Sequence, residues 1–306
     1  MRPDGPEPGW ITARDLAFLI YYYPFQWMVR IAGGAFFPVA QYCAERLSPW
    51  FQARERRVVE RKMMIMLGIS LPDAKRLARK FLRNRVRAAL SDLRRKNGIP
   101  ESVKFVGRER LESALEAGQG VVLLTVHSLA KRECIDAIRQ FNRTFVPVVA
   151  GARRPFRAHG RLLRNFARSR LLPLQATLSG DHINAKDPDS GLQIARVLRE
   201  GGLVLMTPDT AGSAHVYLEF MNVLQPVSAG ILDLARLTGC AIVPLWASYQ
   251  DEKCVVEFRE PLAFAASGNR EEDRRANLPT LLQTMKEQIL AHPEQWEFWD
   301  RRFIAR

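Results

Sequence analysis

The hydrophobic and polar positions divide the chain into a first third of helical pattern and a longer part in which two patterns alternate. From residue 103 onward, short runs of β-branched and aliphatic residues alternate with longer amphipathic stretches, which predicts strands joined by helices. The predicted strands are 103–106, 121–126, 144–150, 203–206, 241–249 and 254–258, and the predicted helices are 108–117, 130–140, 156–170, 190–200, 228–238 and 271–291. The pattern predicts an α/β domain over residues 101–306, with a sheet flanked by helices on both sides.

Residues 1–50 are predicted to associate with a membrane. The segment 16–43 is apolar and aromatic, but Pro24, Arg30 and Pro38 interrupt it, whereas one spanning helix needs roughly 20 uninterrupted apolar residues. Its tyrosines and tryptophans suit a bilayer interface. We therefore expect an interfacial or re-entrant anchor, and the alternative is a pair of helices packed on the core. The flanking residues do not resemble those of a cleavable signal peptide.

Residues 51–100 are predicted to form a basic helical region. Between residues 73 and 96, apolar side chains recur at helical spacing, and lysines and arginines fill the positions between them. Such a charged face is often only a solvated surface. Beside an anionic bilayer, however, each basic side chain adds about 1 kcal/mol of attraction.

The charge of the whole chain points to a polyanionic partner. The 46 lysines and arginines exceed the 32 acidic residues, for a formal net charge of +14. Nucleic acid, an anionic membrane surface and an acidic protein would all satisfy that charge. No nucleic-acid-binding motif is present, and the aromatic N-terminal segment favours a membrane. The four cysteines are widely spaced, which indicates neither a zinc site nor a disulfide framework and is typical of a reducing compartment.

The candidate chemistry lies at the ends of two predicted strands. His127 follows the apolar run 120–126, and Asp209 follows the run 203–206. Open α/β sheets bind ligands at the carboxyl ends of their strands, so both side chains would face one cleft if the two strands are neighbours. A histidine there could act as a general base, although a lone histidine is often structural. Asp209 could position a substrate or could simply cap a turn or helix.

Several segments, in this order along the chain, resemble the bacterial lipid A biosynthesis (lauroyl/myristoyl) acyltransferases, which are related to the glycerolphosphate acyltransferases. The resemblance covers roughly residues 100–306, and the closing segment is its most distinctive part. It rests on 120–127 (GVVLLTVH), 198–209 (LREGGLVLMTPD), 220–222 (FMN), 228–244 (SAGILDLARLTGCAIVP) and 292–303 (HPEQWEFWDRRF). The resemblance implies a glycerolphosphate-acyltransferase-like fold with a mixed, largely parallel sheet.

The resemblance also implies the reaction and its participants. A fatty acyl chain would move from acyl carrier protein, or from acyl-CoA, to a hydroxyl of a lipid or glycolipid at the cytoplasmic face of the bacterial inner membrane. His127 would be the general base of an HxxxxE/D pair, and no cofactor or metal is implied. Asp209, with Arg153, Arg154 and Arg170, would bind substrate, since guanidinium groups match phosphate geometry.

The sequence departs from that pair at its acidic position. The fifth residue after His127 is Arg132, and the carboxylate of Glu133 comes one residue later, which turns it by about 100° on a helix. A local bulge could restore Glu133 as the orienting acid, or Asp209 or another acid could replace it. In the third alternative the activity is altered or lost, and the protein acts as a membrane-associated binding or regulatory subunit.

Overall fold

The structure is a computed structural model that describes residues 53–96, 103–149, 182–209, 215–250 and 253–300, with isolated residues at 10, 39, 42 and 46. Ala40–Ala150 and Ile183–Arg306 form one compact unit, and the fold given below is the fold of that unit. The second unit, Met1–Val39 with Gly151–His182, lies almost entirely outside the described residues, as do the expected membrane anchor and the expected helix 156–170. Within the described ranges, no helix is both long enough and apolar enough to span a bilayer.

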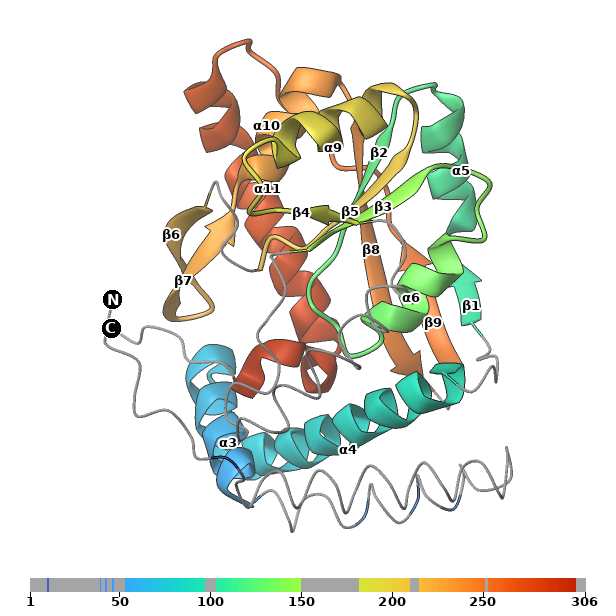
Figure 1. The fold of residues 1–306 in the computed structure, drawn as a ribbon. Coiled ribbons are helices and arrows are strands. Elements are labelled where there is room, and N and C mark those ends of the chain that lie inside the picture. The colour runs from blue at the N-terminus through green and yellow to red at the C-terminus, as the bar shows by residue number, and fades with distance from the viewer. Residues whose placement is uncertain are drawn as a thin grey trace. The chain divides into compact units, whose positions relative to one another are not determined.

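The compact unit combines a helical hairpin with an α/β part (Figure 1). The hairpin consists of α3 (Ala53–Leu67) and α4 (Leu71–Lys96), which pack against each other. The helices of the α/β part are α5 (Arg108–Glu116), α6 (Lys131–Ile138), α9 (Ser190–Arg199), α10 (Gly230–Thr238) and α11 (Arg270–Ala291), and the 3-10 turns η3 (Pro293–Gln295) and η4 (Glu297–Asp300) follow α11.

The main sheet has seven strands in the order β1-β9-β8-β2-β5-β3-β4. These are β1 (Val103–Val106), β2 (Val121–Leu124), β3 (Phe145–Val149), β4 (Ile183–Asn184), β5 (Leu203–Met206), β8 (Ala241–Gln250) and β9 (Lys253–Phe258). All neighbouring strands pair in parallel except β8 and β9, which are antiparallel. The predicted α/β class with a mixed, largely parallel sheet is therefore confirmed.

Two features of the α/β part were not predicted. The first is the short strand β4, and the second is an antiparallel hairpin of β6 (His215–Phe220) and β7 (Val223–Ser228). At the tip of this hairpin, Met221 and Asn222 both adopt positive φ angles, 52° and 63°. Hairpin turns of this kind usually contain glycine, and its absence here concealed the turn.

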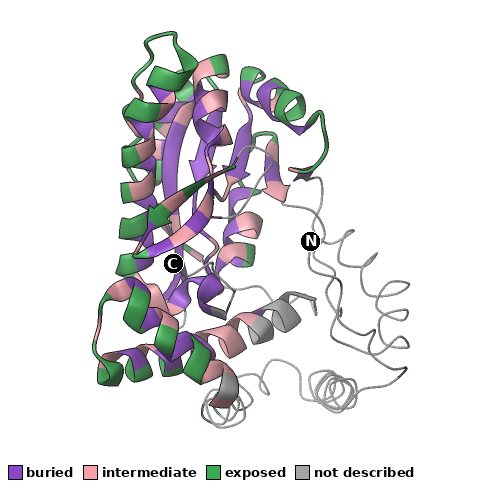
Figure 2. Ribbon diagram, turned by 90° about the vertical axis from the view of Figure 1, so that its left-hand side faces the viewer, coloured by how far each residue is buried: buried purple, intermediate pink, exposed green. Residues whose placement is uncertain are grey.

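The central strand β2 separates two hydrophobic cores. Successive strand side chains point to opposite faces, so Val121 and Leu123 join the core beneath α5 and α6, whereas Val122 and Leu124 join the core beneath α9, α10 and α11. Figure 2 shows the buried strands between layers of helix that are exposed on their outer sides. Because β2 is buried on both faces, the polar residues that follow it mark the edge of the core.

Helix α9 approaches the start of β2 closely at Gly120. A Cβ atom built on Gly120 would lie 2.2 Å from the carbonyl oxygen of Leu198 and 2.5 Å from its Cα. Both of these atoms belong to backbone, which cannot rotate away as a side chain can. The glycine therefore allows the helix to pack directly on the strand that leads to His127.

We expect Gly120→Ala to destabilise the fold by at least about 1–3 kcal/mol, the usual cost of overpacking a core. Gly191→Ala is the matched control, because a Cβ atom at Gly191 meets nothing within 4 Å. Urea-induced unfolding of the two variants would measure the difference. Equal free energies of unfolding would contradict the close approach at Gly120.

Candidate active site

The pairing of β2 with β5 brings His127 and Asp209 together. Leu124, the last residue of β2, is in register with Met206, the last residue of β5. His127 and Asp209 each come three residues after these paired ends. The backbone N–H of Thr125 donates to the carbonyl of Met206 at 3.0 Å, so the two chains continue side by side beyond the strands. The expectation that both side chains lie at one sheet edge depended on these strands being neighbours, and they are.

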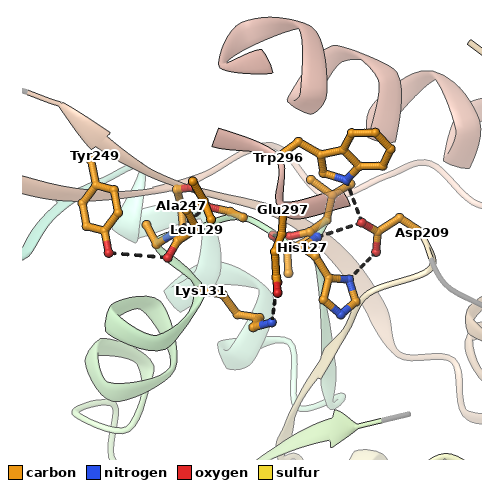
Figure 3. A network of polar contacts seen from close by, with 12 residues as sticks. His127, Leu129, Lys131, Asp209, Ala247, Tyr249, Trp296 and Glu297 are labelled. Carbon is orange, nitrogen blue, oxygen red and sulfur yellow. Dashed lines mark hydrogen bonds and ion pairs between the residues drawn. The ribbon is translucent and has the colours of Figure 1, made fainter. Parts of the chain in front are cut away.

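The His127 imidazole and the Asp209 carboxylate form a direct hydrogen bond (Figure 3). Nδ1 of His127 lies 2.6 Å from Oδ1 of Asp209, and the backbone N–H of His127 donates to Oδ2 at 2.9 Å. An ionised carboxylate only accepts hydrogen bonds, so the proton in the contact belongs to Nδ1. The other ring nitrogen, Nε2, then carries a lone pair that can accept a proton.

Asp209 is held in its ionised form although it is buried. Desolvation by itself raises the pKa of this carboxyl group. The positive charge that His127 can carry, the hydrogen bond from its ring, the indole N–H of Trp296 and the His127 backbone N–H act in the opposite direction and together hold the pKa of Asp209 below its usual value. The site therefore pairs an ionised carboxylate with the imidazole at neutral pH.

The imidazole lies between the buried carboxylate and an aromatic ring. The ring of Phe298 lies 4.4 Å from the ring of His127, centroid to centroid. The His127 side chain still keeps 14% of its surface exposed, whereas that of Asp209 is fully covered. A partly exposed imidazole that a buried carboxylate orients can take a proton from a substrate hydroxyl.

Comparison with known proteins identifies the family. The chain matches the family described as "Bacterial lipid A biosynthesis acyltransferase" over residues 38–304. The chain belongs to this family. The predicted resemblance is thereby confirmed, and membership makes the protein an acyltransferase. No curated protein matches the chain.

Among solved structures, similarity extends to the 1-acyl-sn-glycerophosphate (LPA) acyltransferase PlsC from Thermotoga maritima. The two sequences are 12% identical, and the match covers 90% of this chain and 97% of the other, with a TM-score of 0.34. At that TM-score the similarity carries no structural argument.

Glu133 does not lie where we expected the acid that orients the His127 imidazole. Its carboxylate accepts hydrogen bonds from the Ser91 hydroxyl and, at 2.9 Å, from the Tyr249 hydroxyl. The His127 imidazole instead donates its hydrogen bond to the carboxylate of Asp209. The expectation for Glu133 is therefore corrected: no bulge restores it, and the shift by one residue turns its side chain toward α4 and β8.

Three more residues lie close to His127 in the sequence: Ser128, Arg132 and Cys134. Arg132 is exposed. The Ser128 hydroxyl donates to the Ala247 carbonyl at 2.5 Å and accepts from the Ala130 backbone N–H at 3.0 Å. Burial raises the pKa of the Cys134 thiol well above its usual value, which keeps the thiol protonated and argues against a nucleophilic role.

The expected substrate-binding arginines Arg153, Arg154 and Arg170 lie outside the described residues, so their roles stay predictions. Within the described part of the chain, no group of three or more His, Cys, Asp or Glu side chains is arranged to hold a metal ion.

Sequence reasoning missed the contribution of Trp296. Its indole N–H donates to Oδ2 of Asp209 at 2.9 Å, although the two residues are 87 positions apart. The distinctive closing segment 292–303 was the only signal that could have drawn attention to it. That segment contributed to the family resemblance, but its spacing contains no indication of a contact with a particular acid.

The lowered pKa of Asp209 predicts an acid-dependent loss of stability. A carboxyl group whose folded pKa lies below its unfolded value stabilises the fold above the unfolded pKa, and that contribution disappears as the pH falls through the folded value. The unfolded reference here is 3.8. The difference in free energy of unfolding between the unsubstituted chain and Asp209→Asn should therefore shrink only below about pH 4. Urea titrations at pH 6, 4 and 3 would measure it, and a difference that is independent of pH would contradict the assignment.

Proposed function

We propose that the protein transfers a fatty acyl chain from an acyl carrier protein or acyl-CoA thioester to a hydroxyl of a lipid or glycolipid acceptor, with His127 as the general base. Membership of the acyltransferase family supports the reaction class. The hydrogen-bonded pair of His127 and Asp209 at the carboxyl edge of the sheet is the observation that carries the role of His127.

The proposed reaction follows from the hydrogen bond between His127 and ionised Asp209, which leaves a lone pair on Nε2 of His127. Nε2 of His127 removes the proton from the acceptor hydroxyl while the hydroxyl oxygen attacks the thioester carbonyl carbon. The C–S bond then breaks, and the departing thiolate takes the proton from the imidazolium. Asp209 stays ionised throughout and stabilises the transient positive charge of the ring. The products are an acyl ester and the carrier thiol.

Charge complementarity supports a carrier protein as the donor. Acyl carrier protein is acidic, and a chain with a net charge of +14 would attract it and speed the encounter. Arg153, Arg154 and Arg170 are proposed to bind phosphate groups of the donor or the acceptor. Neither assignment requires a metal or another cofactor.

The surface of the α3–α4 hairpin supports association with an anionic membrane. Val58, Met64, Ile65 and Leu71 are exposed there although they are apolar. The same two helices also carry exposed basic side chains, which we call the basic rim: Arg57, Arg61, Lys75, Arg79, Lys80 and Arg83. The acidic side chains described on the hairpin, Glu55, Glu60 and Asp73, each pair with an arginine. Apolar side chains together with a basic rim suit the headgroup region of an anionic bilayer.

The hairpin also lies next to the proposed catalytic residues. Helix α4 packs against η3 and helix α3 against η4, the two turns that flank Trp296. A membrane bound at this surface would bring lipid hydroxyls close to His127. We propose the cytoplasmic face of the bacterial inner membrane as the location, since Cys134 and Cys240 are present as thiols.

The alternative of an inactive binding or regulatory subunit rested on Arg132 standing where the family has its acid. Since Asp209 supplies a carboxylate to His127, the absence of the acid at residue 132 no longer argues for loss of activity.

Transfer of a labelled acyl chain should depend on His127 and Asp209 but not on Glu133. We expect His127→Ala and Asp209→Asn each to lower kcat by about 10²–10⁴-fold, the usual contribution of an oriented general base. Glu133→Gln should stay within about threefold of the unsubstituted chain, because glutamine can still accept a hydrogen bond from Ser91 or Tyr249. The assay combines purified protein, acyl carrier protein or CoA thioesters carrying the label, and a bacterial lipid extract.

The Glu133 variant serves as the matched control, since it removes a buried carboxylate that lies elsewhere. A loss in Glu133→Gln as large as that in Asp209→Asn would overturn the assignment of the acid. Unchanged product formation by His127→Ala would overturn the assignment of the base.

Contact of the hairpin with a membrane can be tested with a fluorescent probe. Ile65→Cys in a Cys43→Ser background, labelled with an environment-sensitive dye, should shift its emission to shorter wavelength when phosphatidylglycerol vesicles are added. The apolar environment of the bilayer causes this shift, and phosphatidylcholine vesicles should cause a smaller one, because the basic rim then has no anionic lipid to bind.

The matched control places the same dye at Leu192→Cys. Leu192 is an apolar side chain on α9 with 76% of its surface exposed, and it lies away from the basic hairpin. Equal shifts at the two positions would indicate binding without a preferred surface and would contradict the proposal.

A further inference from the structure

The loop that carries His127 is held by residues from the end of the chain. Ser128 and Trp296 form an isolated antiparallel bridge. The backbone N–H of Leu129 donates to the Gln295 carbonyl at 2.9 Å, and the backbone N–H of Glu297 donates to the His127 carbonyl at 2.7 Å. The loop and the closing segment therefore pair like a short piece of sheet, which fixes Trp296 relative to His127.

Trp296 and His127 both donate hydrogen bonds to the Asp209 carboxylate. Oδ1 of Asp209 accepts from the imidazole, whereas Oδ2 accepts from both the His127 backbone N–H and the Trp296 indole N–H. A carboxylate can rotate about its Cβ–Cγ bond, and donors on both oxygens limit that rotation. The indole thus helps to set the plane in which Oδ1 meets Nδ1.

Packing holds the indole itself in a defined orientation. Trp296 is almost completely buried. Its ring lies 4.9 Å from that of Trp299 at an interplanar angle of 90°, and 5.9 Å from that of Phe298. The Phe298 ring in turn lies against His127. The closing segment therefore contacts both members of the pair, one through a hydrogen bond and the other through an aromatic ring.

We propose that Trp296 is a positioning residue of the acyl transfer: through its indole N–H it orients the Asp209 carboxylate, and through Asp209 it orients the His127 imidazole. This inference rests on the proposed role of His127 as general base. Trp296 does not itself touch the reacting atoms. It fixes the geometry in which the base works, so that His127, Asp209 and Trp296 act as one unit.

The charged surroundings of the pair are few in the described part of the chain. Nζ of Lys131 and Oε2 of Glu297 form an ion pair at 3.1 Å, and Figure 3 shows this ion pair on the other side of His127 from Asp209. Substitution of Trp296 by phenylalanine leaves these charges in place. Among the described contacts of Asp209, the substitution removes the hydrogen bond from the indole N–H.

The test compares Trp296→Phe with Trp299→Phe. Both tryptophans are buried in the closing segment, but the indole N–H of Trp299 donates to the Pro293 carbonyl at 2.5 Å and not to Asp209. We expect Trp296→Phe to lower kcat by about 10–100-fold, as for other partners of a functional side chain, with little change in KM. Trp299→Phe should keep kcat within about threefold of the unsubstituted chain, because its indole has no bond to the pair.

The pH profile provides a measurement that a purely structural role would not change. The acidic limb of kcat/KM reports protonation of the essential base in the free enzyme, and Asp209 is hydrogen-bonded to the candidate base. Without the indole N–H the ionised carboxylate is less well stabilised, so the pair takes up its proton more readily. The acidic limb should move to higher pH in Trp296→Phe and should not move in Trp299→Phe.

A second measurement does not depend on activity. The indole N–H resonance of Trp296 can be assigned in the ¹³C,¹⁵N-labelled full-length chain from its correlations to the Trp296 backbone. We expect this resonance to shift with pH as the pair titrates, and this shift with pH to disappear in Asp209→Asn. This measurement uses the unsubstituted chain and the Asp209 variant, so it remains decisive even if Trp296→Phe fails to fold.

The outcomes separate this inference from the proposed function. Equal losses of kcat in the two tryptophan variants with unmoved acidic limbs would overturn the positioning role, as would a Trp296 resonance that responds equally to pH with and without Asp209. Absence of acyl transfer by the unsubstituted chain would overturn the proposed reaction, whereas the indole titration would still decide whether Trp296 controls the pair.

Discussion

The parallel register of β2 and β5 is the constraint on which the site depends. Because Leu124 pairs with Met206, residues at equal distances beyond the two strands come side by side, and His127 meets Asp209. A slip by one residue would turn every side chain of a strand to the opposite face. The two hydrophobic cores prevent such a slip, because alternate residues of β2 are committed to different cores. The packing of the sheet and the geometry of the candidate base therefore have the same origin.

A second set of contacts makes the site depend on the complete α/β part. The Gln288 side chain on α11 accepts from the Val126 backbone N–H and donates to the Thr125 hydroxyl. The Gln295 side chain accepts from the backbone N–H of Tyr249 and donates to the carbonyl of the same residue. These bonds satisfy buried polar groups at the strand ends, where an unpaired group would be costly. Residues far apart in the sequence thus hold one short loop, so the geometry of the loop depends on α11 and the closing turns.

The alternation of short apolar runs with longer mixed stretches predicted the strands of the sheet, apart from β4, and its helices in the described residues. It failed for β4, which is only two residues long, and for the β6–β7 hairpin, whose turn residues Met221 and Asn222 lack the glycine that signals such turns. The position of His127 at a strand end could also be predicted. The partner of His127 stayed open between Glu133 and Asp209 or another acid, because the choice depends on which strands lie side by side.

The difference between Glu133 and Asp209 reflects two ways of bringing an acid to a histidine. An acid on the following helix depends on helix phase, and one residue of displacement rotates it by about 100°. An acid on the neighbouring strand depends on register, which the two cores enforce independently of α6. With the acid supplied by β5, the first turn of α6 can serve another purpose, and Glu133 instead joins α6 to Ser91 of α4 and to Tyr249 of β8. The displaced carboxylate thus ties the basic hairpin to the sheet that carries the candidate base.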